Sequence, residues 1–194
     1  NTHTEKSNTF FIVDPLDGTK EFIHRRGDFT VNIAYVENGI PVMGIVYAPA
    51  KKRLFYTDKN FRSIEEIGPH KVDELGDLKH IKVSKPNLNQ LIVVASKSHR
   101  DKALEDYIAK YNVSDSRAAG SSLKFCLIAV GEADLYPRVG RTMEWDTAAG
   151  HAILRCAGGI VVRYDNHEPL MYGKPYFENP FFIACTPGIN LQKA

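Results

Sequence analysis

The sequence predicts an α/β protein built from two regions that meet between residues 80 and 90. Two observations lead to this class: the first third is rich in strand–turn–strand patterns, and the rest alternates strand-like and helix-like segments. We therefore expect an antiparallel sheet region over residues 1–85 and an α/β region over 86–194. The length of 194 residues allows a substantial core, and we find no internal repeat.

Strand patterns fill the first region. The apolar run Phe10-Phe11-Ile12-Val13 predicts a strand that Asp14 closes, since Pro15 cannot continue a hydrogen-bonded ladder. Asp17 and Gly18 then predict a turn that opens a helix. Further strands are expected over 30–36, 42–47 and 53–56, with the first two joined by a hairpin at Asn38-Gly39. Residues 57–90 are polar and irregular, and we expect a surface excursion there.

The second region begins with a buried strand at 91–95 and a helix over 101–110. A second helix follows, which Ser121 or Ser122 is expected to cap and Gly131 to end. Its apolar residues Leu123, Leu127 and Val130 share one face. A short strand over 135–137 precedes a helix that Asp146 opens and Gly158-Gly159 ends. Two last strands are predicted over 160–163 and 181–185.

Composition excludes several classes of protein. The formal charge of +2 is too small to indicate binding to nucleic acid or to a membrane surface. No apolar run approaches the length that a bilayer requires, and the polar first nine residues do not resemble a secretory signal. Cys126, Cys156 and Cys185 are odd in number and lie among apolar residues, which favours buried free thiols in the cytoplasm.

Two acidic motifs carry the candidate chemistry. Asp14 and Asp17, three positions apart on a tight turn, can face one cation, while the free N–H groups of Gly18 and Thr19 can face an anion. Asp146 follows Trp145 at the start of a helix whose Ala148-Ala149-Gly150 allows close packing. The structural alternative is that these carboxylates only form turns and helix caps.

Together the motifs Asp14–Thr19 (DPLDGT) and Trp145–Gly150 (WDTAAG) resemble the two signatures of the metal-dependent, lithium-sensitive inositol monophosphatase superfamily. The matches over 14–22, 96–99 and 120–125 are most similar to its 3'(2'),5'-bisphosphate nucleotidase branch. The resemblance covers the chain from Phe10 onward. It implies the layered αβαβα fold of sugar phosphatases, with the active site between the two regions.

The resemblance also implies roles for the residues of the motifs. Asp14 would bridge two Mg²⁺ ions, the Leu16 carbonyl would bind one of them, and Asp17 and Asp146 would complete the second site, with two or three ions in the complete enzyme. Asp14 and Thr19 would be catalytic, Thr19 by orienting the attacking water. The amides of Gly18 and Thr19 would hold the phosphate.

The substrate-binding residues implied by the resemblance are Gly18, Thr19, Asp146, His99, Ser121, Lys124 and Arg138. A hydroxyl, an ammonium and a guanidinium make a plausible phosphate clamp. Each alone has a simpler interpretation as a helix cap, a surface charge or a loop histidine. We assign His24, His70, His80 and His167 to the surface, and the aromatic-rich segment 172–182 to core and edge packing.

The implied activity is Mg²⁺-dependent hydrolysis of the 3'-phosphate of adenosine 3',5'-bisphosphate to AMP and phosphate. The alternatives are an inositol or sugar monophosphatase and a chain that binds metal and nucleotide without catalysis. Family members carry a glutamate pair before the first motif, whereas Glu5 is the only acid before Asp14 here. We therefore expect a fragment of a longer cytoplasmic enzyme, either monomeric or homodimeric; some bacterial members lie at the inner face of the membrane.

Overall fold

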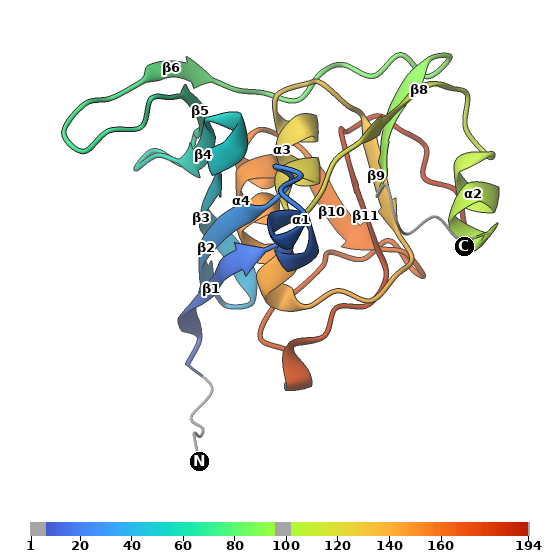
Figure 1. The fold of residues 1–194 in the computed structure, drawn as a ribbon. Coiled ribbons are helices and arrows are strands. Elements are labelled where there is room, and N and C mark those ends of the chain that lie inside the picture. The colour runs from blue at the N-terminus through green and yellow to red at the C-terminus, as the bar shows by residue number, and fades with distance from the viewer. Residues whose placement is uncertain (1–6, 96–101, 194) are drawn as a thin grey trace.

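The computed structural model describes residues 7–95 and 102–193 and contains two β-sheets with helices packed between them (Figure 1). The first sheet is antiparallel, in the order β1-β2-β3-β4-β5-β6. Its strands are β1 (Thr9–Asp17), β2 (Thr30–Glu37), β3 (Ile40–Ala48), β4 (Arg53–Thr57), β5 (Ser63–Ile67) and β6 (Asp77–His80).

The second sheet is mixed and has the order β10-β11-β9-β7-β8. β7 runs parallel to β8 and β9, whereas β11 is antiparallel to β9 and β10. Its strands are β7 (Leu91–Ala95), β8 (Val113–Ala118), β9 (Leu135–Arg138), β10 (Ile160–Arg163) and β11 (Phe182–Cys185).

Three of the described helices cover the two faces of the second sheet. α3 and α4 pack between the sheets, where α4 contacts β2, β3 and β4 and α3 contacts β7 and β9. Strand alternation separates the two faces, because Val94 joins the core beneath α3 and α4 while Val93 joins a cluster with Tyr107 of α2. The described helices are α1 (Thr19–Ile23), α2 (Lys102–Ile108), α3 (Leu123–Ala129) and α4 (Ala148–Cys156), with 3₁₀ turns at Pro49–Lys51, Glu144–Asp146 and Pro175–Phe177.

The predicted α/β class is confirmed, and the described residues supply the βαβα part of the implied layering. The main core cluster takes residues from both sheets, from Ala34 and Val46 as well as Phe182 and Ala184. The division at residues 85 and 86 stays a prediction.

The prediction for residues 57–90 is wrong over two segments, because β5 and β6 extend the first sheet there. The polar residues Ser63, Glu65 and Glu66 of β5 indicated an exposed segment, but all three are buried. Their polar groups are satisfied by specific partners: the Ser63 hydroxyl donates to the Ile153 carbonyl at 2.6 Å, and Glu65 pairs with Arg53. β8 was not expected either, and its residues are mostly exposed.

Several smaller expectations have mixed outcomes. Cys126 and Cys185 are buried free thiols, whereas Cys156 is only half-buried.

His24 and His80 are exposed, but His70 packs its side chain, 9% exposed, beside Glu66 and the Tyr47 ring. His167 is half-buried as well. In the segment 172–182 the first and last aromatic residues are buried, but the three between them are exposed: Tyr176, Phe177 and Phe181.

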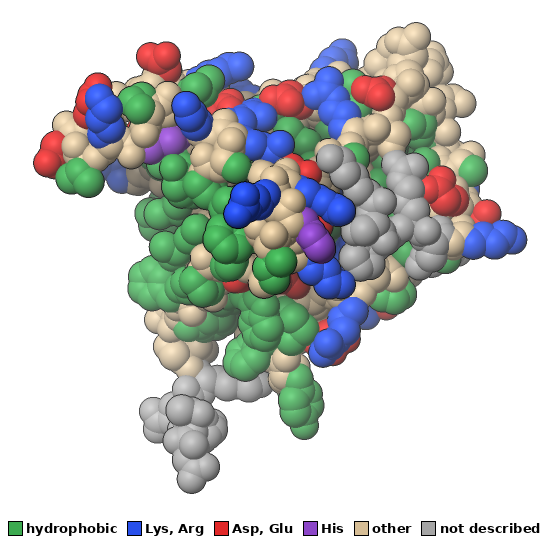
Figure 2. Space-filling view, in the orientation of Figure 1, with side chains coloured by type: hydrophobic (Ala, Val, Ile, Leu, Met, Phe, Trp, Pro, Cys, Tyr) green, Lys and Arg blue, Asp and Glu red, His purple; other side chains and the backbone are tan. Residues whose placement is uncertain are grey.

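The first sheet carries apolar side chains on its outer face. Phe11, Val13, Met43 and Ile45 are exposed there, and Figure 2 shows hydrophobic side chains gathered over β1, β2 and β3. Within residues 7–95 and 102–193, none of the helices combines the length and the apolar character that crossing a membrane requires.

Close contact between α4 and the first sheet depends on small residues. A Cβ on Gly44 of β3 would lie 2.4 Å from the carbonyl oxygen of Ala149 and 3.0 Å from the Cβ of Ala152. Both neighbours belong to a buried helix. The glycine therefore sets how near α4, and the turn before it, approach the sheet.

We predict that Gly44→Ala destabilises the protein by about 2 kcal/mol, because the added methyl group forces α4 away from β3. Urea denaturation measures the change. Gly140→Ala is the control, since its Cβ would meet atoms no closer than 3.4 Å. Equal midpoints for the two variants would contradict the packing argument.

Candidate metal centre and phosphate pocket

Three carboxylates from distant parts of the chain converge at one point. Asp14 and Asp17 lie on β1, and Asp146 ends the 3₁₀ turn before α4. Each offers an oxygen atom, and these oxygens all lie within 4.8 Å of one another. All three side chains are half-buried.

A β-bulge aims the first two carboxylates the same way. Asp14 pairs with Asn32 and Asp17 with Thr30, so that one residue is extra on β1. Residues three apart on a regular strand point to opposite faces, and the extra residue restores a common face. The prediction that the strand ends at Asp14 is therefore wrong: the ladder skips Pro15 and Leu16 and resumes at Asp17.

The turn before α4 orients Asp146. The Met143 N–H donates to Asp146 Oδ2 at 2.7 Å, and the Asp146 N–H donates to the Met143 carbonyl at 3.1 Å. The prediction that Asp146 opens the helix is wrong, because α4 begins at Ala148. Buried Glu144 holds the other side of the turn, accepting the Gly173 and Lys174 N–H groups at 2.9 Å.

The loop before α3 contacts both acidic motifs. The Ser122 N–H donates to Asp17 Oδ2 at 2.9 Å, and the Ser122 hydroxyl donates to the Asp146 carbonyl at 2.8 Å. The Ser121 hydroxyl donates to the Asp28 carbonyl at 3.1 Å. Ser122 occupies the predicted N-cap position of α3, but its side chain makes no hydrogen bond to the helix.

Gly18 allows the first motif to approach this loop. Its φ of +86° is unfavourable for residues with a side chain, and a Cβ there would lie 2.4 Å from Ser121 Oγ. Gly18 is therefore required for two reasons: it adopts a positive φ, and it leaves room for the loop at Ser121.

Burial and crowding disfavour the charged forms of the acids. Burial, followed by the negative charge of Asp146, raises the pKa of Asp17 to about 6. Burial also raises the pKa of Asp14 and of Asp146 above the ordinary aspartate value. A cation between the three carboxylates would relieve this repulsion, and an all-oxygen set suits a hard divalent ion. The acidic group is therefore able to bind a metal ion.

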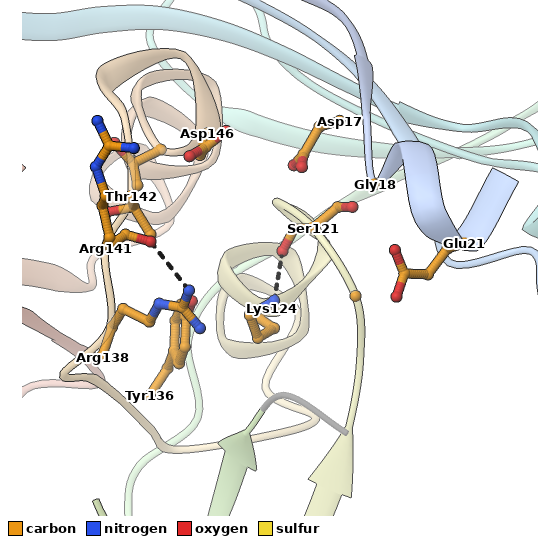
Figure 3. A pocket seen from close by; sticks show the side chains of 12 residues that line it. Asp17, Gly18, Glu21, Ser121, Lys124, Tyr136, Arg138, Arg141, Thr142 and Asp146 are labelled. Atoms are coloured by element: carbon orange, nitrogen blue, oxygen red, sulfur yellow. Dashed lines mark hydrogen bonds between the residues drawn. The ribbon is translucent and has the colours of Figure 1, made fainter. Parts of the chain in front are cut away.

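A basic wall faces Asp17 and Asp146 across a cavity of about 180 Å³ (Figure 3). Lys124 is buried, its ammonium donates to the Ser121 carbonyl at 2.9 Å, and it lies 5.3 Å from the centre of the Tyr136 ring. Burial lowers the pKa of Lys124 to about 8. Arg138 donates to the Arg141 carbonyl at 3.2 Å. Lys124 is thus not the solvated surface charge of the simpler interpretation.

The structure places the other expected site residues less directly. Thr19 is exposed, and its hydroxyl donates to the Leu16 carbonyl at 3.2 Å. The hydroxyl expected to orient water and the carbonyl expected to bind metal are therefore bonded to each other. The Leu16 N–H donates to Asp14 Oδ1 at 3.0 Å. His99 lies outside the described residues.

Sequence reasoning missed several residues that line the cavity. Glu21 follows the first motif by two residues, and Arg141 and Thr142 lie just before the second. Their closeness to a motif in the sequence could have identified them. The remaining missed lining residues are Gly120, Tyr136 and Thr147.

Comparisons with known proteins identify similar sequences and structures. Residues 1–191 match the inositol monophosphatase family. The 3'(2'),5'-bisphosphate nucleotidase CysQ of Salmonella typhimurium is 45% identical over 173 residues, which are 89% of this chain and 66% of the relative. CysQ of Escherichia coli K12 is 44% identical over 183 residues, covering 94% of this chain and 68% of the relative. The chain spans about two thirds of the length of these relatives.

A solved structure gives the same result. The crystal structure of CysQ from Bacteroides thetaiotaomicron has a TM-score of 0.83 and 44% identity, covering 92% of this chain and 70% of that one. The expected likeness to the bisphosphate nucleotidase branch is confirmed. The chain belongs to the inositol monophosphatase family.

Proposed function

We propose that the protein containing this chain is a Mg²⁺-dependent phosphomonoesterase that removes the 3'-phosphate of adenosine 3',5'-bisphosphate, leaving AMP and phosphate. One observation carries the proposal: Asp17 and Asp146, two of the three converging carboxylates, share a single cavity with Arg138 and the buried Lys124. The relatives named 3'(2'),5'-bisphosphate nucleotidase support the same substrate.

The acidic wall is the proposed metal site. Asp14, Asp17 and Asp146 would hold the Mg²⁺ ions, with the Leu16 carbonyl as a further oxygen ligand. Bound there, the metal would polarise the phosphate and lower the pKa of a water molecule. The Thr19 hydroxyl, now bonded to the Leu16 carbonyl, would turn to orient that water. The Gly18 and Thr19 amides would receive the phosphate oxygens.

The basic wall is the proposed site for the second phosphate. Lys124 and Arg138 lie on the side of the cavity opposite Asp17 and Asp146 (Figure 3). The Ser121 hydroxyl, which lies beside Gly18, would add a hydrogen bond to the substrate. Two walls of opposite charge suit a substrate that presents one phosphate for reaction and another for binding. An inositol monophosphate offers only the first of these. This difference favours the nucleotide over the inositol ester.

We predict that Asp17→Asn stabilises the metal-free protein at pH 7 while abolishing its stabilisation by Mg²⁺. The pKa of Asp17 in the folded state is about 6, above the value of 3.8 for a free aspartate. The folded state therefore binds more protons between pH 4 and 6, and stability falls as pH rises through that window. A neutral amide removes this loss, on the order of 3 kcal/mol.

Thermal unfolding with and without Mg²⁺, at pH 5 and pH 7, measures both effects on the full-length protein. Asp165→Asn is the control, since this exposed carboxylate pairs with Arg163 and lies away from the cavity. A variant at Asp17 that still gains stability from Mg²⁺ as the wild type does would refute the metal site.

We predict that Arg138→Ala lowers kcat/KM for adenosine 3',5'-bisphosphate at least tenfold and that for 3'-AMP much less, because only the first substrate carries a 5'-phosphate for the guanidinium. Loss of one hydrogen bond to a charged group corresponds to about 1.5–3 kcal/mol. Steady-state kinetics on both substrates, with inositol 1-phosphate as a third, gives the comparison.

Arg62→Ala serves as the control, because Arg62 pairs with Asp58 outside the cavity. Equal losses on both nucleotides would exclude Arg138 from the second-phosphate site. Wild-type turnover of inositol 1-phosphate equal to that of the bisphosphate would instead favour the inositol monophosphatase alternative, and metal and nucleotide binding without phosphate release would favour the non-catalytic one. The role of His99, the cytoplasmic location and the oligomeric state stay predictions.

A further inference from the structure

Ser122 joins two of the three aspartates through two different groups. Its backbone N–H donates to the carboxylate of Asp17 and its hydroxyl donates to the backbone carbonyl of Asp146, at 2.9 and 2.8 Å. The side chain is fully buried, at 0% exposure. It lies at the N-cap position of α3, yet its hydroxyl makes no bond to that helix. The hydroxyl is thus committed to the turn that carries Asp146.

We propose that Ser122 is a positioning residue that sets the separation between Asp17 and Asp146 before a metal ion binds. The inference rests on the proposed metal site and adds a residue that does not itself contact the metal. The Asp146 carboxylate is aimed by the Met143 N–H within its own turn. The Ser122 hydroxyl holds this turn at the N-cap of α3, and the N–H group of the same residue holds the Asp17 carboxylate.

Electrostatics explains why such a link matters. Three carboxylates with oxygens within 4.8 Å of one another repel, so a turn released from α3 would move Asp146 away from Asp17. Glu144 anchors the turn from the opposite side, to the Gly173 and Lys174 amides, and offers no restraint toward Asp17. Loss of a partner that orients a metal ligand typically weakens metal binding about 10–100-fold.

Ser63 provides a matched control within the same core. It is also a buried serine, and its hydroxyl donates to the Ile153 carbonyl at 2.6 Å. Ser122→Ala and Ser63→Ala therefore remove the same kind of bond, one at the proposed metal site and one away from it. The two variants separate metal affinity from general stability.

The experiment measures Mg²⁺ dissociation constants of the full-length protein by calorimetry, together with metal-free unfolding midpoints. We expect Ser122→Ala to raise the dissociation constant about tenfold or more. Ser63→Ala should leave it within about twofold, although both variants lose stability. Ser122→Thr, which keeps a hydroxyl, should restore most of the affinity. Ser122→Gly, tolerated at helix N-caps, is the second variant should the alanine protein not fold.

Two results would overturn the inference. One is an unchanged dissociation constant in both Ser122→Ala and Ser122→Gly, and the other is an equal loss of affinity in Ser63→Ala. Failure of the proposed function looks different: the wild type itself would bind no Mg²⁺, or Asp146→Asn would bind it as tightly as the wild type.

Discussion

Repulsion among Asp14, Asp17 and Asp146 is the constraint on which the rest of the structure depends. Their carboxylate oxygens lie within 4.8 Å of one another, partly removed from water, and burial raises the pKa of each group. Such an arrangement is unfavourable for folding on its own. The core between the two sheets must stabilise it, and a divalent cation bound among the three carboxylates would relieve the repulsion.

Three local features of the backbone bring the three carboxylates together: a bulge and two close approaches at glycine residues. The bulge in β1 places Asp14 and Asp17 on one face. Gly18 lets this segment approach the loop at Ser121, and Gly44 lets α4 lie close to β3. The turn that ends in Asp146 thereby reaches the end of β1. The acidic cluster is thus a consequence of close packing between the first sheet and the helices behind it.

The sequence was most informative where function restricts residue type. The three aspartates could be selected from two short motifs, because acids at a strand end and beside a helix suit metal binding. The bulge could not be foreseen, since it depends on the register with Asn32 and Thr30. The N-cap position of Ser122 could be predicted, but not the partner of its hydroxyl, because the Asp146 carbonyl is remote in sequence. β5 was missed because buried Ser63 and Glu65 look like surface residues until Ile153 and Arg53 are placed beside them.

The most direct test of the metal site is the anomalous scattering of Mn²⁺ in crystals of the full-length protein. The account predicts a peak between Asp14, Asp17 and Asp146, with metal–oxygen distances of about 2.1 Å. A fully occupied manganese site elsewhere, with no peak among these three carboxylates, would contradict it.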